Sequence, residues 1–553
     1  MTNTINTSPL QRSVNGQDLK EGVAPNVTMS EETKAKMQTS IAESKAQQPS
    51  KPVELPSVTV EISTAPFKHA PKIEFESGVL RYTPEGDPEY LHRNELLAAE
   101  LEAQTNRKEF NPTSYLANIT ELDLSKGSYK DGVRNYAGFL PYDMDGNRLT
   151  ADYKGFNKAP VVASFSLDIE TKDGDKVTIT INKEEGGTRF AGGSFAGIKG
   201  SSFEFDFEGD LDEDELEAIQ TLAMDLSQSA GAFFNGQGMA QLNGLESFDK
   251  NELSGFDLSL YSQRHMNSEA EFHFEIDKYS GNQTLEASQF GLEYSITVDK
   301  NNQLVDKDAN QSLQFQSYLA MIDHMAESYK IPGLRTSEVA SFFKDGFSTA
   351  LGFSLGEDYE REENDKTALN DHQLKVAQSS LSGLPDFEAS FFGTGVAGVT
   401  PNLEKPTERS FMSLEIQQET SVQKGLNSKG RHAEITQAST YELDVRQHKP
   451  LLGLDLVDFK NQTYRYETMK EEGALLRSIN VQDDGKINSG KVTQAQSKEE
   501  TMIEYQNGDV TDQKESKEQF AQSLDTTELD VLKDDKLNRQ LGLYKTINTL
   551  LDN

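Results

Sequence analysis

The chain contains neither cysteine nor tryptophan in its 553 residues. Without a thiol it can form no disulfide, cysteine nucleophile, cysteine-ligated zinc site or iron–sulfur cluster, so those classes of function are excluded. The lack of tryptophan weighs mildly against a site that stacks on carbohydrate rings. A cysteine-free composition also fits proteins that are exported unfolded through narrow channels, although chance or host bias produces it as well.

Basic residues are scarce. Lys and Arg number 54 against 91 Asp and Glu, which leaves a net charge of −37. Nucleic-acid backbones and anionic membrane surfaces attract clustered cations, so neither is expected as a partner. The charge is compatible with solubility through self-repulsion, with cation binding and with a salt-adapted host.

Apolar runs long enough to cross a bilayer are also lacking, so no membrane span is expected. Residues 1–18 do not show the charged and then apolar pattern of a secretory signal. The cytoplasm is therefore the default localisation. Secretion without a cleavable leader, or association with a cell surface, stays open because specialised export systems tolerate a start rich in Ser, Thr and Asn.

Changes in composition and in the spacing of apolar residues divide the chain into six segments. Residues 1–55 are polar with balanced charge and are predicted to form a disordered arm. The other segments are a mixed segment with one helix (56–155), an α+β domain (156–355), a charged linker (356–386), a polar β-rich region (387–510) and a C-terminal helical segment (511–553).

Strand and helix signals come in blocks within residues 156–355. Phe165 to Ile181 predict a hairpin, since two alternating runs flank a Lys-Asp-Gly-Asp turn. Phe203 to Phe207 predict a strand, and Leu216 to Phe234 predict a helix with one apolar face. Further strands and two helices follow. This order favours an antiparallel sheet with helices packed on one face, the α+β class, followed by a polar β-rich region and a C-terminal helix.

Nine acids lie between Glu204 and Glu217, and three of them, Asp210, Asp212 and Asp214, are weak candidates for a calcium site. Acids of the strand alternate toward solvent, and acids at a helix start cap free N–H groups and complement the helix dipole. No calcium-loop spacing is met. The sequence therefore assigns no metal, no cofactor and no catalytic residue, with Ca²⁺ kept as a minor alternative.

A glycine-rich stretch, Gly186–Ser202, precedes the Phe203 strand. It fails as a phosphate-binding loop because Ile198 stands where a Lys is required and because a strand follows it. It fails as a nucleophile elbow because Ala196 replaces the second glycine. We therefore expect a flexible connector. The eight histidines likewise form no HxH or HxxxH metal pair.

The block from Phe165 to Leu260, with its KDGD turn and its GDLDEDELEAI helix start, resembles a module of uncharacterised acidic proteins of Gram-negative bacteria. The resemblance covers about a fifth of the chain. It implies a bacterial source and brings no activity, because no catalytic motif lies inside it.

Three functional hypotheses remain open. The first is a non-enzymatic bacterial structural or protein-interaction protein with a protein partner, which the missing site motifs favour. The second is a hydrolase that uses carboxylates brought together from distant residues, for which a concave pocket with converging acids of perturbed pKa would be the sign. The third is a calcium-stabilised extracellular module.

Overall fold

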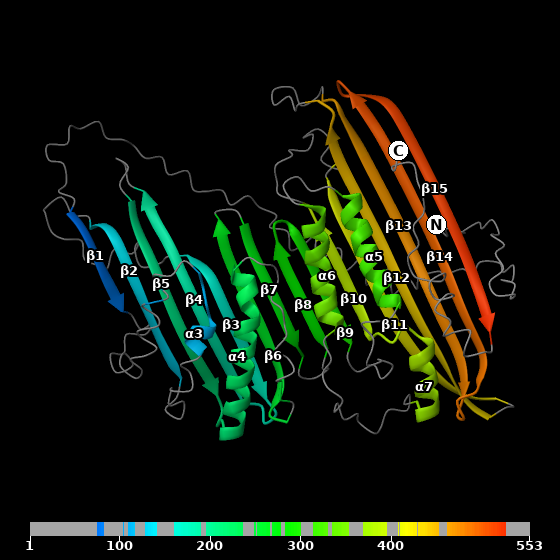
Figure 1. The fold of residues 1–553 in the computed structure, drawn as a ribbon, viewed down its shortest axis with the longest axis horizontal. Helices are drawn as coiled ribbons and strands as arrows, with labels where there is room; N and C mark the ends of the chain where they lie inside the picture. The colour runs from blue at the N-terminus through cyan, green and yellow to red at the C-terminus, as the bar shows by residue number, and fades with distance from the viewer. Residues whose placement is uncertain are drawn as a thin grey trace.

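A computed structural model of the chain describes residues 74–81, 103, 105, 109–116, 128–140, 160–189, 195–235, 248–249, 251–265, 268–277, 282–299, 313–329, 335–352, 369–394, 408, 410–427, 430–452 and 462–526. Within them the chain forms one antiparallel sheet of 15 strands in the order β1-β2-β5-β4-β3-β6-β7-β8-β9-β10-β11-β12-β13-β14-β15 (Figure 1).

The strands are β1 Glu74–Arg81, β2 Tyr129–Leu140, β3 Val161–Thr171, β4 Lys176–Arg189, β5 Phe195–Glu208, β6 Leu253–His265, β7 Ser268–Ile276, β8 Gln283–Gln289, β9 Leu292–Asp299, β10 Asp386–Gly393, β11 Phe411–Asn427, β12 Gly430–Pro450, β13 Tyr464–Gln482, β14 Ile487–Gln506 and β15 Asp509–Thr526. The helices are α3 Thr113–Leu116, α4 Glu213–Asn235, α5 Leu313–Ser328, α6 Thr336–Gly352 and α7 Asp371–Ser380.

The predicted α+β class is wrong. The sheet does not stop at a domain boundary near residue 355: β10 pairs with β9 on one side and with β11 on the other, so the ladder continues without a break. The fold is therefore β-rich, and one large sheet unites the two regions that the sequence analysis separated. The pattern of apolar residues showed several of the strands but could not show that β9 and β10, far apart in the chain, are neighbours.

Several local predictions are confirmed. β3 and β4 form the predicted hairpin, with Phe165 opposite Ile181 and a turn at Gly174, whose φ is +96°. α4 covers the predicted helix. Its buried positions include Ile219, Leu222 and Leu226, which recur at helical spacing because one stripe faces the sheet.

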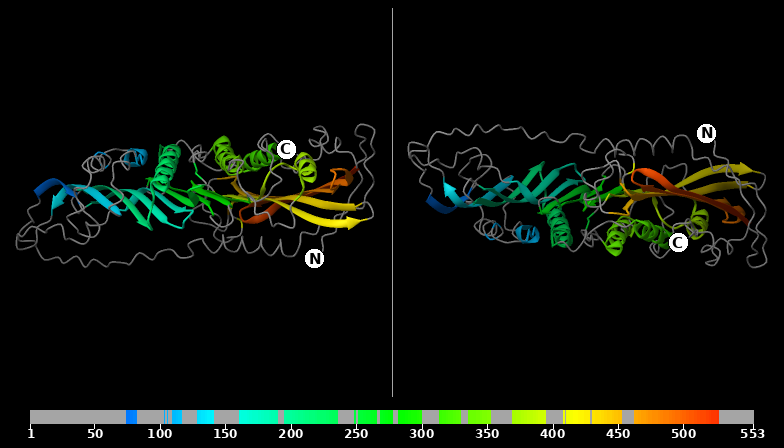
Figure 2. Two further views of the ribbon diagram at one scale, coloured as in Figure 1. Left: turned by 90° about the horizontal axis from the view of Figure 1, so that it is seen from below. Right: turned by 90° about the horizontal axis from the view of Figure 1, so that it is seen from above.

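The described helices lie along one side of the sheet (Figure 2). Aromatic rings connect the two layers. Phe233 of α4 packs on Phe272 of β7 with 6.4 Å between ring centroids, and Phe343 of α6 packs edge-on against Phe391 of β10 at 5.3 Å. This side carries the apolar core, which leaves the opposite side to polar residues.

Two helical glycines differ in the space around them. A Cβ at Gly346 of α6 would lie 2.5 Å from Cζ of Tyr294, whereas a Cβ at Gly231 of α4 would meet no atom within 4 Å. We expect Gly346→Ala to lower the free energy of unfolding by about 1–3 kcal/mol through overpacking. Gly231→Ala should raise it by about 0.5–1 kcal/mol, since alanine is the better helix former. Thermal melts of both variants test this, and equal effects would contradict it.

The glycine-rich stretch is not a connector. Most of it belongs to β4 and β5, where Gly187 pairs with Gly197 and Glu184 with Gly200. β2 pairs with the other side of β5, so that Arg134 lies opposite Gly200. Ladder hydrogen bonds on both sides of β5 therefore outweigh the poor strand propensity of glycine.

Other segment boundaries also need revision. α7 occupies Asp371–Ser380, inside the stretch predicted as a charged linker, and a capping box between Asn370 and Gln373 begins it. β15 continues to Thr526, inside the segment expected to be helical from residue 511. The rest of that segment, from residue 527, lies outside the described residues, as does the predicted disordered arm, residues 1–55.

None of the helices in the described part of the chain is long and apolar enough to cross a membrane.

Candidate functional site

The far side of β11, β12 and β13 presents polar residues, and we call this surface the open face. Side chains alternate between the two sides of a strand. Leu414, Leu443 and Leu475 are buried on the helix side, so their neighbours on each strand point the other way. No described helix lies on the open face (Figure 2).

Three glutamates form a row across the open face. Glu415 of β11 lies directly opposite Glu442 of β12, and Glu442 lies directly opposite Glu472 of β13. Directly opposite residues have their Cβ atoms about 5 Å apart, and like charges at that separation destabilise the sheet. Glu388 of β10 adds a fourth carboxylate, since it lies diagonal to Glu415. We call these four residues the glutamate row.

The next row toward the C-terminal end of β12 shows the opposite arrangement. Asp444 faces Lys470, Lys470 faces Glu499, and Glu499 faces Lys517 across four successive strands. Lys517 and Glu499 also form an ion pair. Charges in this row are thus matched within the sheet, whereas those in the glutamate row are not.

The pKa values of two glutamates in the row are raised, first by burial and second by the neighbouring carboxylates. Burial, together with the charges of Glu442 and Glu388, raises the pKa of Glu415 from 4.5 to about 7. Burial and the charge of Glu472 raise the pKa of Glu442, although Lys470 opposes this. The row therefore holds its negative charge at a cost in stability, and a cation placed over it would relieve that cost.

The raised pKa of Glu415 predicts that replacing this residue by Gln stabilises the protein, and that the gain in stability depends on pH. Because the folded-state pKa of about 7 exceeds the ordinary value of 4.5, ionised Glu415 destabilises the fold progressively as pH rises between those values. Glu415→Gln should raise the free energy of unfolding by about 1 kcal/mol at pH 8 and by much less at pH 5. Denaturant titrations at the two pH values measure this.

Glu434 provides the matched control for that experiment. It is an exposed acid on the same side of β12, but it faces the uncharged residues Gln423 and Asn480. Glu434→Gln should therefore leave stability unchanged at both pH values. A gain from Glu434→Gln equal to that from Glu415→Gln would show that net charge, and not the row, is responsible.

An aromatic cluster borders the open face. The ring of His448 stacks on Tyr464 at 4.3 Å, and Tyr464 stacks on Tyr505 at 4.6 Å between centroids. Both tyrosine hydroxyls donate to Glu408, at 2.5 and 2.8 Å. Burial lowers the pKa of His448, which keeps the imidazole neutral near pH 7. The cluster is a satellite core that anchors the ends of β12, β13 and β14.

A buried polar cluster lies on the helix side, beneath α5. Glu471 is 1% exposed and accepts hydrogen bonds from Oη of Tyr441 at 2.7 Å and from Nε2 of Gln496 at 2.5 Å. Nε2 of His324 lies 3.3 Å from the same carboxylate. Burial acts to raise the pKa of Glu471, but its contacts with His324, Tyr441 and Gln496 lower it below the ordinary value. This cluster joins α5 to the sheet.

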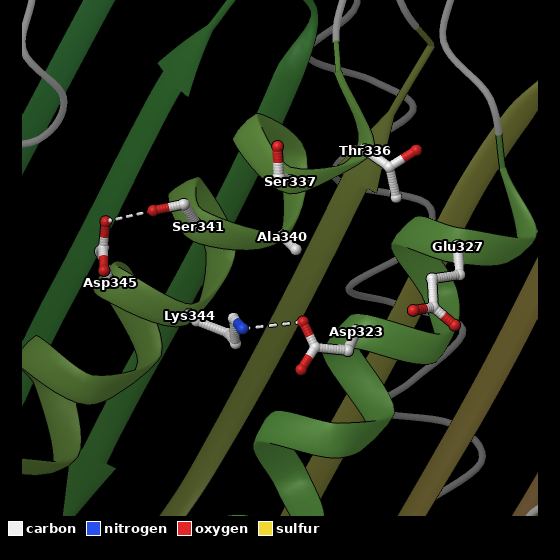
Figure 3. A pocket seen from close by; sticks show the side chains of 8 residues that line it. All are labelled: Asp323, Glu327, Thr336, Ser337, Ala340, Ser341, Lys344 and Asp345. Carbon is white, nitrogen blue, oxygen red and sulfur yellow. Dashed lines mark hydrogen bonds and ion pairs between the residues drawn. The ribbon is translucent and has the colours of Figure 1, made fainter.

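A shallow depression of about 550 Å³ lies between α5 and α6 (Figure 3). Nζ of Lys344 lies 2.7 Å from Oδ1 of Asp323, and Ser341 donates to Asp345 at 3.0 Å. Glu327 is the third acid of the lining. Glu415 and Glu442, whose pKa values are raised, lie on the other side of the sheet. The described residues thus do not bring perturbed carboxylates together in this depression.

The acids singled out from the sequence lie at the start of α4. The backbone N–H of Asp210 donates to Asp175 at 3.2 Å. Asp212 and Glu215 form a reciprocal capping box, with backbone N–H to carboxylate distances of 3.0 and 2.9 Å. Asp214 is exposed in the first turn. Among the described residues, no group of three or more acids or histidines is placed to hold a metal ion.

Sequence reasoning missed the glutamate row. The signal was present, because Glu415 lies between Leu414 and Ile416, and Glu442 lies between Tyr441 and Leu443, in strands that alternate clearly. What the sequence lacks is the register of the four strands β10 to β13, and a slip of one residue would have dispersed the row.

Searches with this chain found no matching family model, no matching curated protein and no matching solved structure.

Proposed function

We propose that this chain is a non-enzymatic protein-interaction protein whose open face binds a basic segment of a partner protein. The glutamate row carries the proposal. Like charges placed directly opposite each other cost stability, and the adjacent row shows that the same sheet accommodates matched charges. A row of charges of the same sign favours binding of a partner that carries the opposite charge.

The spacing of the row suits a basic helix. Adjacent strands lie about 4.8 Å apart, so successive carboxylates of Glu415, Glu442 and Glu472 are separated by that distance or a little more. Lys or Arg residues at positions i and i+4 of a helix have Cβ atoms about 5–6 Å apart. A helix laid across the strands would place one cation over each carboxylate.

Binding of a defined peptide tests the proposal. The probe is an alanine-rich helical peptide with a Lys at every fourth position, and fluorescence anisotropy gives its affinity. Since an exposed ion pair contributes up to about 1 kcal/mol, replacing Glu415, Glu442 and Glu472 together by Gln should weaken binding about tenfold or more. Added salt should weaken binding to the wild type.

Another triple variant separates the row from net charge. Glu271, Glu286 and Glu293 are exposed acids of β7, β8 and β9, and none of them lies opposite another acid in the sheet. Replacing all three by Gln removes the same charge. Equal loss of affinity in the two triple variants would overturn the proposal, because binding would then follow overall charge alone.

A further inference from the structure

β15 forms one edge of the sheet, and within the described residues no strand pairs with its outer side (Figure 1). Residues 509–515 and Lys517 are exposed. An edge strand offers a row of backbone N–H and C=O groups to any second strand, and charged side chains usually oppose such pairing. The order of the charges therefore decides which strand can pair here.

The charges of β15 are arranged symmetrically about Ser516. Residues 513–519 read Gln-Lys-Glu-Ser-Lys-Glu-Gln. If two copies pair antiparallel with Ser516 opposite Ser516, Lys514 faces Glu518 of the second copy and Glu515 faces Lys517 of the second copy. Each of these pairs occurs twice, so every charge of the segment meets an opposite charge about 5 Å away.

Geometry limits the other registers. The outer edges of two β15 strands can pair antiparallel only through a twofold axis perpendicular to the sheet. Directly opposite residues then point to the same side of the sheet. The axis therefore passes between the two copies of one residue, and each possible register is centred on a residue. Centring on Lys514, Glu515, Lys517 or Glu518 places that residue opposite its own copy, and so opposite its own charge. Centring on Gln513 also matches charges, but it pairs only residues 509–517 of β15, whereas the Ser516 register pairs residues 509–523.

The alternating row of the open face leads to the same edge. It runs from Asp444 through Lys470 and Glu499 to Lys517, which is 53% exposed. In the Ser516 register the next residue across the interface is Glu515 of the second copy, so the alternation of sign continues into that copy. Lys514, on the helix side and 57% exposed, is likewise accessible to Glu518 of the second copy.

We propose that β15 is a homodimerisation strand, which pairs with β15 of a second copy in the Ser516 register. The two sheets then form one continuous sheet with the helices of both copies on the same side. Both glutamate rows face the other side, so the dimer presents two open faces side by side. This pairing does not depend on the glutamate row and can fail or hold independently of the proposed function.

Two charge-reversed variants test the register. Lys514→Glu/Lys517→Glu makes this segment of β15 uniformly acidic, and Glu515→Lys/Glu518→Lys makes it uniformly basic. Each variant alone places like charges opposite each other, whereas a mixture of the two matches every charge. Sedimentation velocity is measured at physiological ionic strength, where repulsion between two chains of net charge −37 is largely screened beyond about 8 Å.

The wild type should sediment at twice the monomer mass, each variant alone as a monomer, and the mixture again as a dimer. Circular dichroism and thermal melts must show that both variants are folded, because Lys517→Glu also removes the ion pair with Glu499. A wild type that stays monomeric up to about 100 μM overturns the proposal. Dimerisation of either variant alone, or a mixture that stays monomeric, also overturns it. Dimerisation of Glu515→Lys/Glu518→Lys alone would point to the register centred on Gln513, in which Lys514 faces Asp512 and Lys517 faces Asp509.

Discussion

Leu226→Asp is expected to abolish the native fold of the region around α4. Leu226 is 0% exposed and belongs to the stripe of α4 that packs on the sheet, where α4 contacts β3 and β6. The substitution removes a buried apolar side chain and places an unpaired carboxylate in the core. The combined cost is roughly 5 kcal/mol or more, comparable with the whole stability of a typical domain. Circular dichroism and limited proteolysis should show unfolding.

Asp214→Asn is the matched control in the same helix. Asp214 is exposed in the first turn of α4, where its charge interacts with the helix dipole. Its loss should cost about 1 kcal/mol or less. If Leu226→Asp melted like the wild type, the assignment of this helix face to the core would be wrong.

Glu471→Ala is expected to have the second-largest effect. The carboxylate accepts hydrogen bonds from Tyr441 and Gln496 and lies against His324, all in a buried setting. Removing the acceptor leaves these partners buried without it, which should lower the free energy of unfolding by about 3–5 kcal/mol. Chemical denaturation monitored by tyrosine fluorescence measures the loss, and Glu471→Gln, which keeps one acceptor oxygen, should lose less.

The same carboxylate predicts a dependence on acidity. The folded-state pKa of Glu471 lies below its ordinary value of 4.5, so ionised Glu471 stabilises the protein fully above pH 4.5. This contribution is lost as pH falls through the folded-state pKa. Glu471→Gln should therefore show a shallower loss of stability below pH 4.5 than the wild type. Parallel acid unfolding curves would argue against a charged Glu471 in the fold.

Local structure was readable where one face of an element is purely apolar. Phe165, Leu167 and Ile169 alternate cleanly, and both the hairpin of β3 and β4 and the helix α4 follow from such periods. β8 carries no clear strand signal in the sequence, because Gln283 and Ala287 occupy buried positions where larger apolar residues would have marked a strand.

The fold class failed for a related physical reason. On β11 to β14 the side that faces the helices is itself polar in places, with Gln418, Gln437 and Gln496 buried. Tertiary hydrogen bonds satisfy such residues: Gln418, for instance, accepts from Tyr318 of α5. The sequence pattern does not show these hydrogen-bond partners from other elements. The region was therefore interpreted as a separate, polar β-rich region.

The candidate site was harder still to predict. Asp210, Asp212 and Asp214 are close together in sequence and attracted attention for that reason, yet Asp212 serves to cap a helix. The residues of the glutamate row are distant in sequence and meet only through the pairing of β10 to β13. Clustering across a sheet depends on register, which the sequence does not display.

Zero-length carbodiimide cross-linking of the lysine-bearing helical peptide to the full chain, with mass spectrometric mapping, tests the proposed binding surface most directly. The reagent joins a lysine amine to a carboxylate in contact with it, so the cross-links report where the peptide lies. We predict that they concentrate on Glu415, Glu442 and Glu472. Cross-links centred on the acids of α4, or spread evenly over the 91 acidic residues, would contradict the assignment of the open face as the binding surface.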